Sequence, residues 1–423
     1  MPFFPCAHAA HPLWQHAVKQ VIVQLQAQVS MQHLDDQPCL AVVYISAPYA
    51  GKASDIVAML SKALPQVQHW VGCAGHSVLA GDMDYGHAGA LAVMLPYLAA
   101  QHYQVFSSLA PRSPGPVAAH TVLIHGDASS PHKALQVQKL HQQWLGAVCI
   151  GALCDLQDQH AQWAWGGQPP GAMPMSIGGG GVQVGGLSGV VFADAAEALS
   201  VGMQGCKPLG AAYVMTRVDG DVVLELDGKP ALEVFFSDVQ WGDVLAQRHP
   251  NADALWQKIQ STWMAMTPPG SYVSGPCLPS DARVLKVVGI DLLRQGIVLN
   301  GLPVLGRSLM QCQWDEQAAR TDIRRACAQL WESLTTSVAH ASPASDSAVP
   351  MGRSICGAIY IRNQQRHKIA RTPEVDAELQ LIRHALGPVP LLGFSASCEI
   401  EGGELQHLSA QLLVFTQPLP SLS

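Results

Sequence analysis

Apolar residues recur along the chain with two periods, and these periods predict alternating helices and buried strands. His11–Gln28 carries an apolar residue at every fourth position, beginning with Leu13, which predicts an amphipathic helix. Continuous apolar runs rich in β-branched residues, such as Leu40–Ser46, are typical of strands that are buried on both faces. The chain is therefore predicted to alternate between strands and helices.

One order of elements, a strand, a helix, a second strand and then further β structure, is predicted three times. The strand pairs are Leu40–Ser46 with His69–Cys73, Thr121–His125 with Ala147–Leu153, and Cys356–Arg362 with Val389–Phe394. The helices between them are Ser54–Leu64, Pro131–Trp144 and Pro373–Leu386. Because such a crossover joins parallel strands, each pair should run parallel, either as neighbours or with one strand between them. The hairpins that follow imply antiparallel partners, so we predict an α/β (mixed α+β) fold of repeated units, with mixed sheets flanked by helices.

The helical period also predicts which side chains face the core. Leu135 and Val375 are predicted to lie on the inward faces of their helices. Two further helices are predicted over Asn251–Met266, with Trp263 in register, and over Gln317–Leu334. Loop-forming stretches separate the predicted elements at Ser107–Pro116, Gly166–Pro174, Thr267–Pro279 and Thr335–Pro350.

The stretch Val201–Leu232 holds the densest set of turn signals in the chain. Two β-rich runs, Ala212–Val218 and Val222–Leu226, flank Asp219-Gly220-Asp221, and this arrangement predicts a hairpin. A second tight turn follows, after which Pro230 is predicted to open a helix at its first position.

The same stretch resembles the junction motif of the FIST family, which is named for F-box and intracellular signal transduction proteins. The residues that carry the resemblance are Met203-Gln204-Gly205-Cys206-Lys207-Pro208-Leu209-Gly210, Thr216 and Glu225-Leu226-Asp227-Gly228-Lys229-Pro230-Ala231-Leu232. Met203 stands where the family usually carries Ser. The turn Val71–Gly75 is similar to a turn of the family's N-terminal domain. Gly393–Ile400, followed by His407, is similar to a turn of its C-terminal domain.

The resemblance implies an organisation and a role. It implies a FIST N-terminal domain over residues 37–237 and a FIST C-terminal domain over residues 238–423, and the helix predicted from the apolar period forms a separate N-terminal segment over residues 1–36. The family implies a sensory protein that binds a small molecule, with amino-acid-like ligands among the implied classes. No output module is recognised, so we expect either that the signal passes to a separate signalling protein or that the chain is a stand-alone binder. The family's F-box members imply an adaptor or scaffold as an alternative.

Composition narrows the setting in which such a protein acts. Of the 423 residues, 48% are apolar and 13% are charged, which suits a large folded core. The formal net charge is -7 and no block rich in Lys or Arg occurs, so nucleic acid and membrane partners are not expected. The 11 Cys form no C-x-x-C pair, and the N-terminus lacks the pattern of a signal peptide. We therefore expect a cytoplasmic protein.

The candidate ligand site consists of Gly-rich turns at strand ends. Such turns leave backbone groups without ladder partners, and buried groups of this kind need a partner, which a polar ligand can provide. We predict that at least two of these turns line one cleft and that the carboxylate of Glu399 is available to an amine or a hydroxyl. The predicted ligand-binding residues are Gly72, Cys73, Gly205, Cys206, Ser395, Ser397 and Glu399. The alternative is that the cysteines are small buried residues and that Glu399 makes a structural hydrogen bond.

The sequence lacks the usual signatures of catalysis. It contains no G-x-S-x-G and no H-E-x-x-H, so we expect no enzyme activity, no catalytic residues and no metal. Some FIST proteins are described as haem-binding nitric oxide sensors, so haem is the alternative cofactor. His76, His87 and His407 are the candidate axial ligands. No C-x-x-C-H is present, so such a haem would be bound non-covalently.

Overall fold

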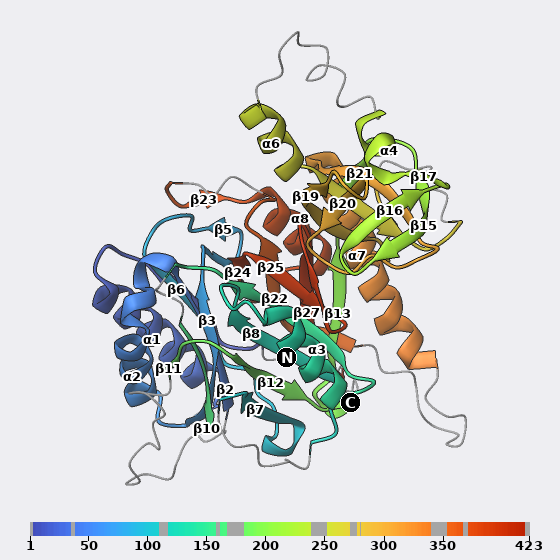
Figure 1. Cartoon of the computed structure of the whole chain (residues 1–423). Helices are drawn as coiled ribbons and strands as arrows, with labels where there is room; N and C mark the ends of the chain where they lie inside the picture. Colours follow the sequence, from blue (N-terminus) through green and yellow to red (C-terminus); the bar gives the residue numbers. More distant parts are fainter. Residues whose placement is uncertain are drawn as a thin grey trace. The chain divides into compact units, whose positions relative to one another are not determined.

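A computed structural model describes residues 3–34, 39–109, 117–157, 161–166, 182–237, 252–270, 277–279, 281–339, 353–366 and 371–418 (Figure 1). Most of the residues in the four predicted loop stretches lie outside these ranges. The chain forms two compact units. The core unit comprises Met1–Gly202, Arg324–Leu405 and Ala410–Ser423, and the inserted unit comprises Met203–Ile323 and Gln406–Ser409. The two units divide the chain at other places than the predicted domain boundary at residue 238. That boundary concerns the family's domains and stays a prediction.

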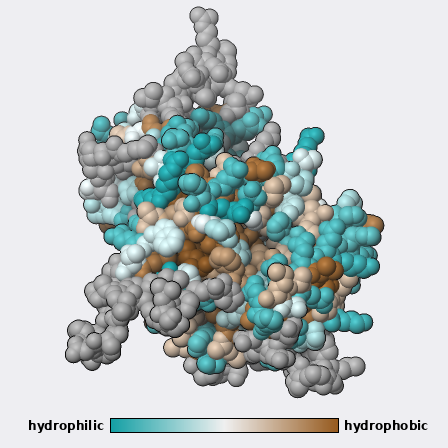
Figure 2. Space-filling model, turned by 180° about the vertical axis from the view of Figure 1, so that it is seen from behind, coloured by the Kyte–Doolittle hydropathy of each residue, from teal (hydrophilic) through white to brown (hydrophobic). Residues whose placement is uncertain are grey.

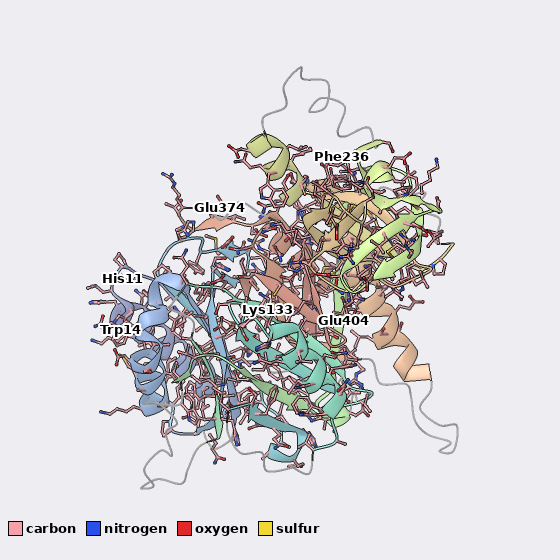
Figure 3. The ribbon with its side chains drawn as sticks, viewed as in Figure 1. His11, Trp14, Lys133, Phe236, Glu374 and Glu404 are labelled. Carbon is pink, nitrogen blue, oxygen red and sulfur yellow. The ribbon has the colours of Figure 1, made fainter. Side chains whose placement is uncertain are left out.

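The core unit contains three modules that share a strand, a helix, a second strand, a hairpin and a closing strand. The first module consists of β1 (Cys6–Ala10), α1 (Trp14–Met31), β2 (Cys39–Ser46), α2 (Ala53–Ala63), β3 (Val67–Gly75), β4 (Val78–Ala80), β5 (Met83–Asp84) and β6 (Ala90–Met94). Strands β2 and β3 run parallel, and β6 pairs antiparallel with both β1 and β2. His11 and Trp14 lie near the start of α1 (Figure 3).

The second and third modules repeat this shared order, although the described residues of the second contain no helix between its first two strands, where the first module has α1. The second consists of β7 (Tyr103–Ser107), β8 (Thr121–Asp127), α3 (Lys133–Gln143), β9 (Val148–Cys154), β10 (Gln162–Gly166), β11 (Val182–Gln183) and β12 (Leu187–Phe192). The third consists of β13 (Ala198–Met203), α7 (Glu316–Ala339), β22 (Arg353–Asn363), β23 (Glu374–Val375), α8 (Ala377–Leu386), β24 (Leu391–Ala396), β25 (Cys398–Glu401), β26 (Glu404–Gln406) and β27 (Ala410–Pro418). The pairs β8–β9 and β22–β24 are parallel, so all three predicted parallel pairs are confirmed as direct neighbours.

Each module contributes a hairpin, called its exchanged hairpin, to the sheet of another module, in cyclic order. The hairpin β4–β5 of the first module joins the sheet of the third, where β4 pairs with β24. Strand β10 of the second module pairs with β3 of the first, and β25 of the third pairs with β9 of the second. Glu404 marks the hairpin β25–β26 in Figure 3. This pairing order occurs three times among the described strands.

A glycine occupies the same position in the second strand of each parallel pair. Gly72, Gly151 and Gly393 each lie opposite a residue of the neighbouring strand. A Cβ atom there would lie 1.8, 1.9 and 1.6 Å from the carbonyl oxygens of those residues, Val43, Ile124 and Tyr360. Only glycine allows this approach of the two backbones.

The main hydrophobic core is shared by all three modules. Tyr44 of β2, Leu123 of β8 and Phe394 of β24 belong to one buried cluster. A second cluster lies between the first module's sheet and helices α1 and α2, and a third cluster includes the inward face of α3. The face drawn in Figure 2 carries both hydrophilic and hydrophobic patches, whereas the sheets that meet at the centre are buried. Packing within this shared cluster therefore fixes the positions of β2, β8 and β24 relative to one another.

The inserted unit is antiparallel throughout its described pairs. Its elements are β14 (Cys206–Pro208), β15 (Tyr213–Asp219), β16 (Val222–Leu226), β17 (Lys229–Pro230), α4 (Ala231–Ser237), α6 (Ala252–Gln260), β18 (Trp263–Thr267), β19 (Arg283–Asp291), β20 (Gly296–Leu299) and β21 (Ser308–Trp314). The pairings run β15-β16-β20-β19-β18-β21 and return to β15, so the sheet closes on itself. The predicted hairpin is confirmed as β15–β16, with Gly220 at φ 60°.

Four local predictions are wrong. Leu135 is exposed because the buried face of α3 is set by Val137, about 200° away around the helix. Val375 is exposed in β23, because the side chain of Asp376 caps α8 and fixes the start of the helix after it.

The other two corrections concern helix ends in the inserted unit. Helix α6 ends at Gln260, and Trp263 instead begins β18, which pairs with both β19 and β21. Pro230 pairs with Glu225 in β17, so α4 begins one residue later, at Ala231.

Candidate functional site

Three polar residues follow the three glycine positions at one interval. His76 comes four residues after Gly72, Asp155 four after Gly151 and Ser397 four after Gly393. In each module this residue lies where the chain leaves the parallel pair and enters the exchanged hairpin. The carboxyl ends of parallel strands are where α/β proteins usually bind ligands.

The three residues meet at the Ser397 hydroxyl. His76 Nε2 lies 2.8 Å from Ser397 Oγ, and the backbone N–H of Asp155 donates to the same oxygen at 2.8 Å. His76 and Ser397 are half-buried, whereas Asp155 is exposed, so solvent reaches one side of the group. We call His76, Asp155 and Ser397 the strand-end site.

Burial lowers the pKa of His76 to about 4, although the nearby carboxylate of Asp155 acts to raise this pKa. The imidazole is therefore neutral near pH 7. A base with such a low pKa is a weak acceptor of a proton in a reaction, since general bases work best when their pKa lies near the working pH. The contact with Ser397 thus favours hydrogen bonding over nucleophilic catalysis.

Backbone contacts hold two of the predicted turns together. The His76 N–H donates to the Ser395 carbonyl at 2.9 Å, and the Ser395 N–H donates to the Ser77 carbonyl at 3.0 Å. The Ser77 hydroxyl lies 2.9 Å from Ser395 Oγ. The turn after Gly72-Cys73 and the turn at Ser395–Glu399 are therefore adjacent, and a shared cleft between them stays a prediction.

Glu399 is fully buried. Its carboxylate oxygens accept from Asn363 Nδ2 at 3.2 and 3.3 Å. The same Nδ2 donates to the Ser397 carbonyl at 3.1 Å. Glu399 therefore takes part in the internal hydrogen bonding that holds Ser397, and its predicted contact with a ligand stays a prediction.

A buried network of charges adjoins the two turns. The Arg362 guanidinium donates to Asp84 Oδ2 at 2.5 Å and to Asp376 Oδ2 at 2.6 Å, and its Nε lies 3.4 Å from Ser395 Oγ. Glu378 accepts from Arg366 at 2.6 Å and from the Tyr360 hydroxyl at 2.8 Å. Because Asp84 belongs to the first module, Arg362 attaches the exchanged hairpin β4–β5 to the third.

Cys73 is buried and hydrogen-bonded to Cys154. Burial, followed by this contact, raises the pKa of the Cys73 thiol well above its ordinary value. The thiol therefore stays protonated, and protonated thiols are poor nucleophiles. This environment favours a packing role for Cys73.

Gly205 and Cys206 belong to the inserted unit, whereas the other predicted ligand residues belong to the core unit. The backbone N–H groups of Gln204 and Gly205 donate to Asp322 Oδ2 at 2.6 and 3.4 Å. Lys207 and Asp315 form an ion pair at 2.8 Å. These contacts give the junction motif an anchoring role within the inserted unit.

The three haem candidates differ in their surroundings. His76 Nε2 contacts Ser397, and His407 Nε2 lies 2.8 Å from Asn300 Nδ2. His87 is exposed. Within the described residues, no group of three His, Cys, Asp or Glu is arranged to hold a metal ion. Haem binding stays an alternative prediction that these contacts do not favour.

Asp155 and Arg362 were not predicted as site residues. Asp155 could have been found from the fixed interval of four residues after each glycine, which the sequence already displays. Arg362 carried no such signal, because its partners Asp84 and Asp376 come from distant parts of the chain.

Comparison with known protein families agrees with the motifs that lie within residues 39–229. Residues 39–229 match the family described as the FIST N domain. The FIST N domain is thus recognised over these residues, and a C-terminal FIST domain stays a prediction. None of the described helices is long and apolar enough to cross a membrane.

The chain is also similar to two uncharacterized proteins of Mycobacterium tuberculosis, from strains CDC 1551 / Oshkosh and ATCC 25618 / H37Rv. Each is 23% identical over 205 residues. The aligned region covers 48% of this chain and 46% of each relative, so it spans about half the length of these curated relatives.

Proposed function

We propose that the protein is a cytoplasmic sensor that binds a small polar ligand at the strand-end site and passes the signal to a separate protein. The observation that carries this proposal is the meeting of His76 and Asp155 at the Ser397 hydroxyl. Polar groups from three distant segments converge there at the carboxyl ends of strands, and one side is open to solvent.

The position of the site supports a relay. His76, Asp155 and Ser397 each stand at the point where an exchanged hairpin begins. A ligand that contacts two of them links two modules and favours one arrangement of their hairpins. A ligand shifts the equilibrium between two conformations of the protein only as far as it binds one of them more tightly than the other. The exchanged hairpins are therefore the elements through which we propose that the signal leaves.

The class of ligand and the setting complete the proposal. Amino-acid-like ligands are the class that the family resemblance implies. Ten cysteines, nearly all those of the chain, are free thiols, which supports a reducing compartment such as the cytoplasm. The low pKa of His76 supports binding without catalysis.

A thermal-shift screen of small polar metabolites tests this function. A ligand present at about 100 times its Kd stabilises the folded state by about 2.7 kcal/mol, which raises the melting temperature measurably. We expect a metabolite that stabilises the wild type but not the Ser397→Ala variant. Ser61→Ala, which removes an exposed hydroxyl from α2, is the matched control and should keep the response. Hits that stabilise all three proteins equally would contradict the proposal.

A further inference from the structure

The hydrogen bonds of the Ser397 hydroxyl determine which nitrogen of the His76 ring carries the proton. Ser397 Oγ accepts from the Asp155 N–H, and its one proton needs an acceptor. Among the described residues, His76 Nε2 is the acceptor within reach, at 2.8 Å. Nε2 therefore accepts, and the proton of the neutral imidazole lies on Nδ1.

The strand-end site thus offers one donor and one acceptor. No described residue is hydrogen-bonded to His76 Nδ1, which presents its N–H as a donor. Asp155 Oδ1 accepts from the Gln157 N–H at 3.1 Å, and Oδ2 has no partner among the described residues. The Asp155 carboxylate lies close enough to act on the charge of the His76 ring.

This pair of groups discriminates between chemical classes. A ligand carboxylate would satisfy the Nδ1–H but would be repelled by the Asp155 carboxylate. An ammonium group would satisfy Asp155 but would offer nothing that accepts from Nδ1–H. A neutral amide offers both groups, because its carbonyl oxygen accepts while its N–H donates.

We propose that the strand-end site recognises the edge of a neutral carboxamide or ureido group, with His76 Nδ1–H donating to its carbonyl oxygen and Asp155 Oδ2 accepting from its N–H. This inference rests on the proposed function and specifies which part of the ligand enters the site. It makes Asp155 the residue that separates amides from carboxylates.

Isothermal titration calorimetry with two matched pairs of probes tests the inference. L-glutamine is compared with L-glutamate, and L-asparagine with L-aspartate. The two members of each pair differ only in their side-chain group, which is a carboxamide in one and a carboxylate in the other. Hydantoin serves as a rigid ureido probe. We expect the wild type to bind a carboxamide or hydantoin, and to prefer the amide of a pair by about 10-fold or more, the effect of one charged hydrogen bond.

The Asp155→Asn variant is the decisive protein. It keeps the backbone N–H that holds Ser397, but it removes the charge and replaces one acceptor oxygen with an NH2 donor, so the amide preference should fall to within about threefold. Asp194→Asn makes the same change at an exposed carboxylate beside the amino end of β8 and should keep the preference. Melting curves of both variants should match that of the wild type.

The outcomes separate this inference from the proposed function. Equal or tighter binding of the carboxylate probes would overturn the amide inference, as would an amide preference that survives Asp155→Asn. If all these probes fail while the metabolite screen gives hits that need Ser397, the amide inference is wrong and the proposed function stands. If the screen gives no such hits either, both fail.

Discussion

Replacing Arg362 with Met should strongly destabilise the core unit. The side chain is 2% exposed, and it forms ion pairs with Asp84 at 2.5 Å and Asp376 at 2.6 Å. Glu378 Oε2 lies 3.5 Å from the same guanidinium. Arg362→Met would leave these carboxylates buried without their shared cation, and removing one partner of a buried pair costs about 3–5 kcal/mol.

The assay is equilibrium unfolding in urea, followed by tryptophan fluorescence at pH 7. Arg383→Met is the matched control, because Arg383 forms a longer pair of 3.7 Å with the half-exposed Asp82. An exposed pair of this kind contributes about 0–1 kcal/mol, so the control should unfold near the wild-type midpoint. Adding Asp84→Asn to Arg362→Met should recover part of the loss, since it removes one of the stranded charges.

Two results would refute this reasoning. If Arg362→Met costs no more than Arg383→Met, the buried network does not hold the hairpin β4–β5 in place. If Asp84→Asn adds its full separate cost to that of Arg362→Met, the two residues are not coupled, and the contact at 2.5 Å carries no energetic weight.

Four further tests probe other parts of the structure. Gly393→Ala would place a Cβ 1.6 Å from a carbonyl oxygen, so the core unit should lose several kcal/mol or fail to fold, read by circular dichroism. Asp322→Ala would leave two buried N–H groups without an acceptor, and each such group costs about 1–3 kcal/mol of stability. The inserted unit should therefore begin to unfold at a lower urea concentration. The pKa of His76 falls from near 6.5 in the unfolded chain to about 4 when folded, so stability should be lost as the pH falls from 6.5 to 4. This loss is at most about 3 kcal/mol and should shrink in His76→Gln, measured by urea titrations at both pH values. Protein expressed with a haem precursor should stay colourless, and a Soret band that one histidine substitution abolishes would establish the haem alternative.

Local signals predicted much of the fold. The apolar runs and helical periods located the three parallel pairs, because a crossover of that length leaves only one common arrangement. The hairpin β15–β16 followed from its turn residues alone. Val375 was misplaced because a capping residue, and not the apolar period, decides where α8 begins.

The exchange of hairpins could not be predicted in the same way. Strand β4 pairs with β24, more than 300 residues further along, and no property of the short segment Val78–Ala80 names that partner. The partners of Arg362 were hidden for the same reason. Ser397 was predicted as a site residue, but its contact with His76 depends on this long-range pairing.

Native mass spectrometry tests the central claim most directly. Wild type, Ser397→Ala and Ser61→Ala would be purified from the same host and sprayed under non-denaturing conditions. We predict that the wild type and the Ser61→Ala control retain a small non-covalent ligand, and that Ser397→Ala has lost most of it. Equal retention by all three proteins, or a wild type that carries no ligand, would contradict a binding site at the Ser397 hydroxyl.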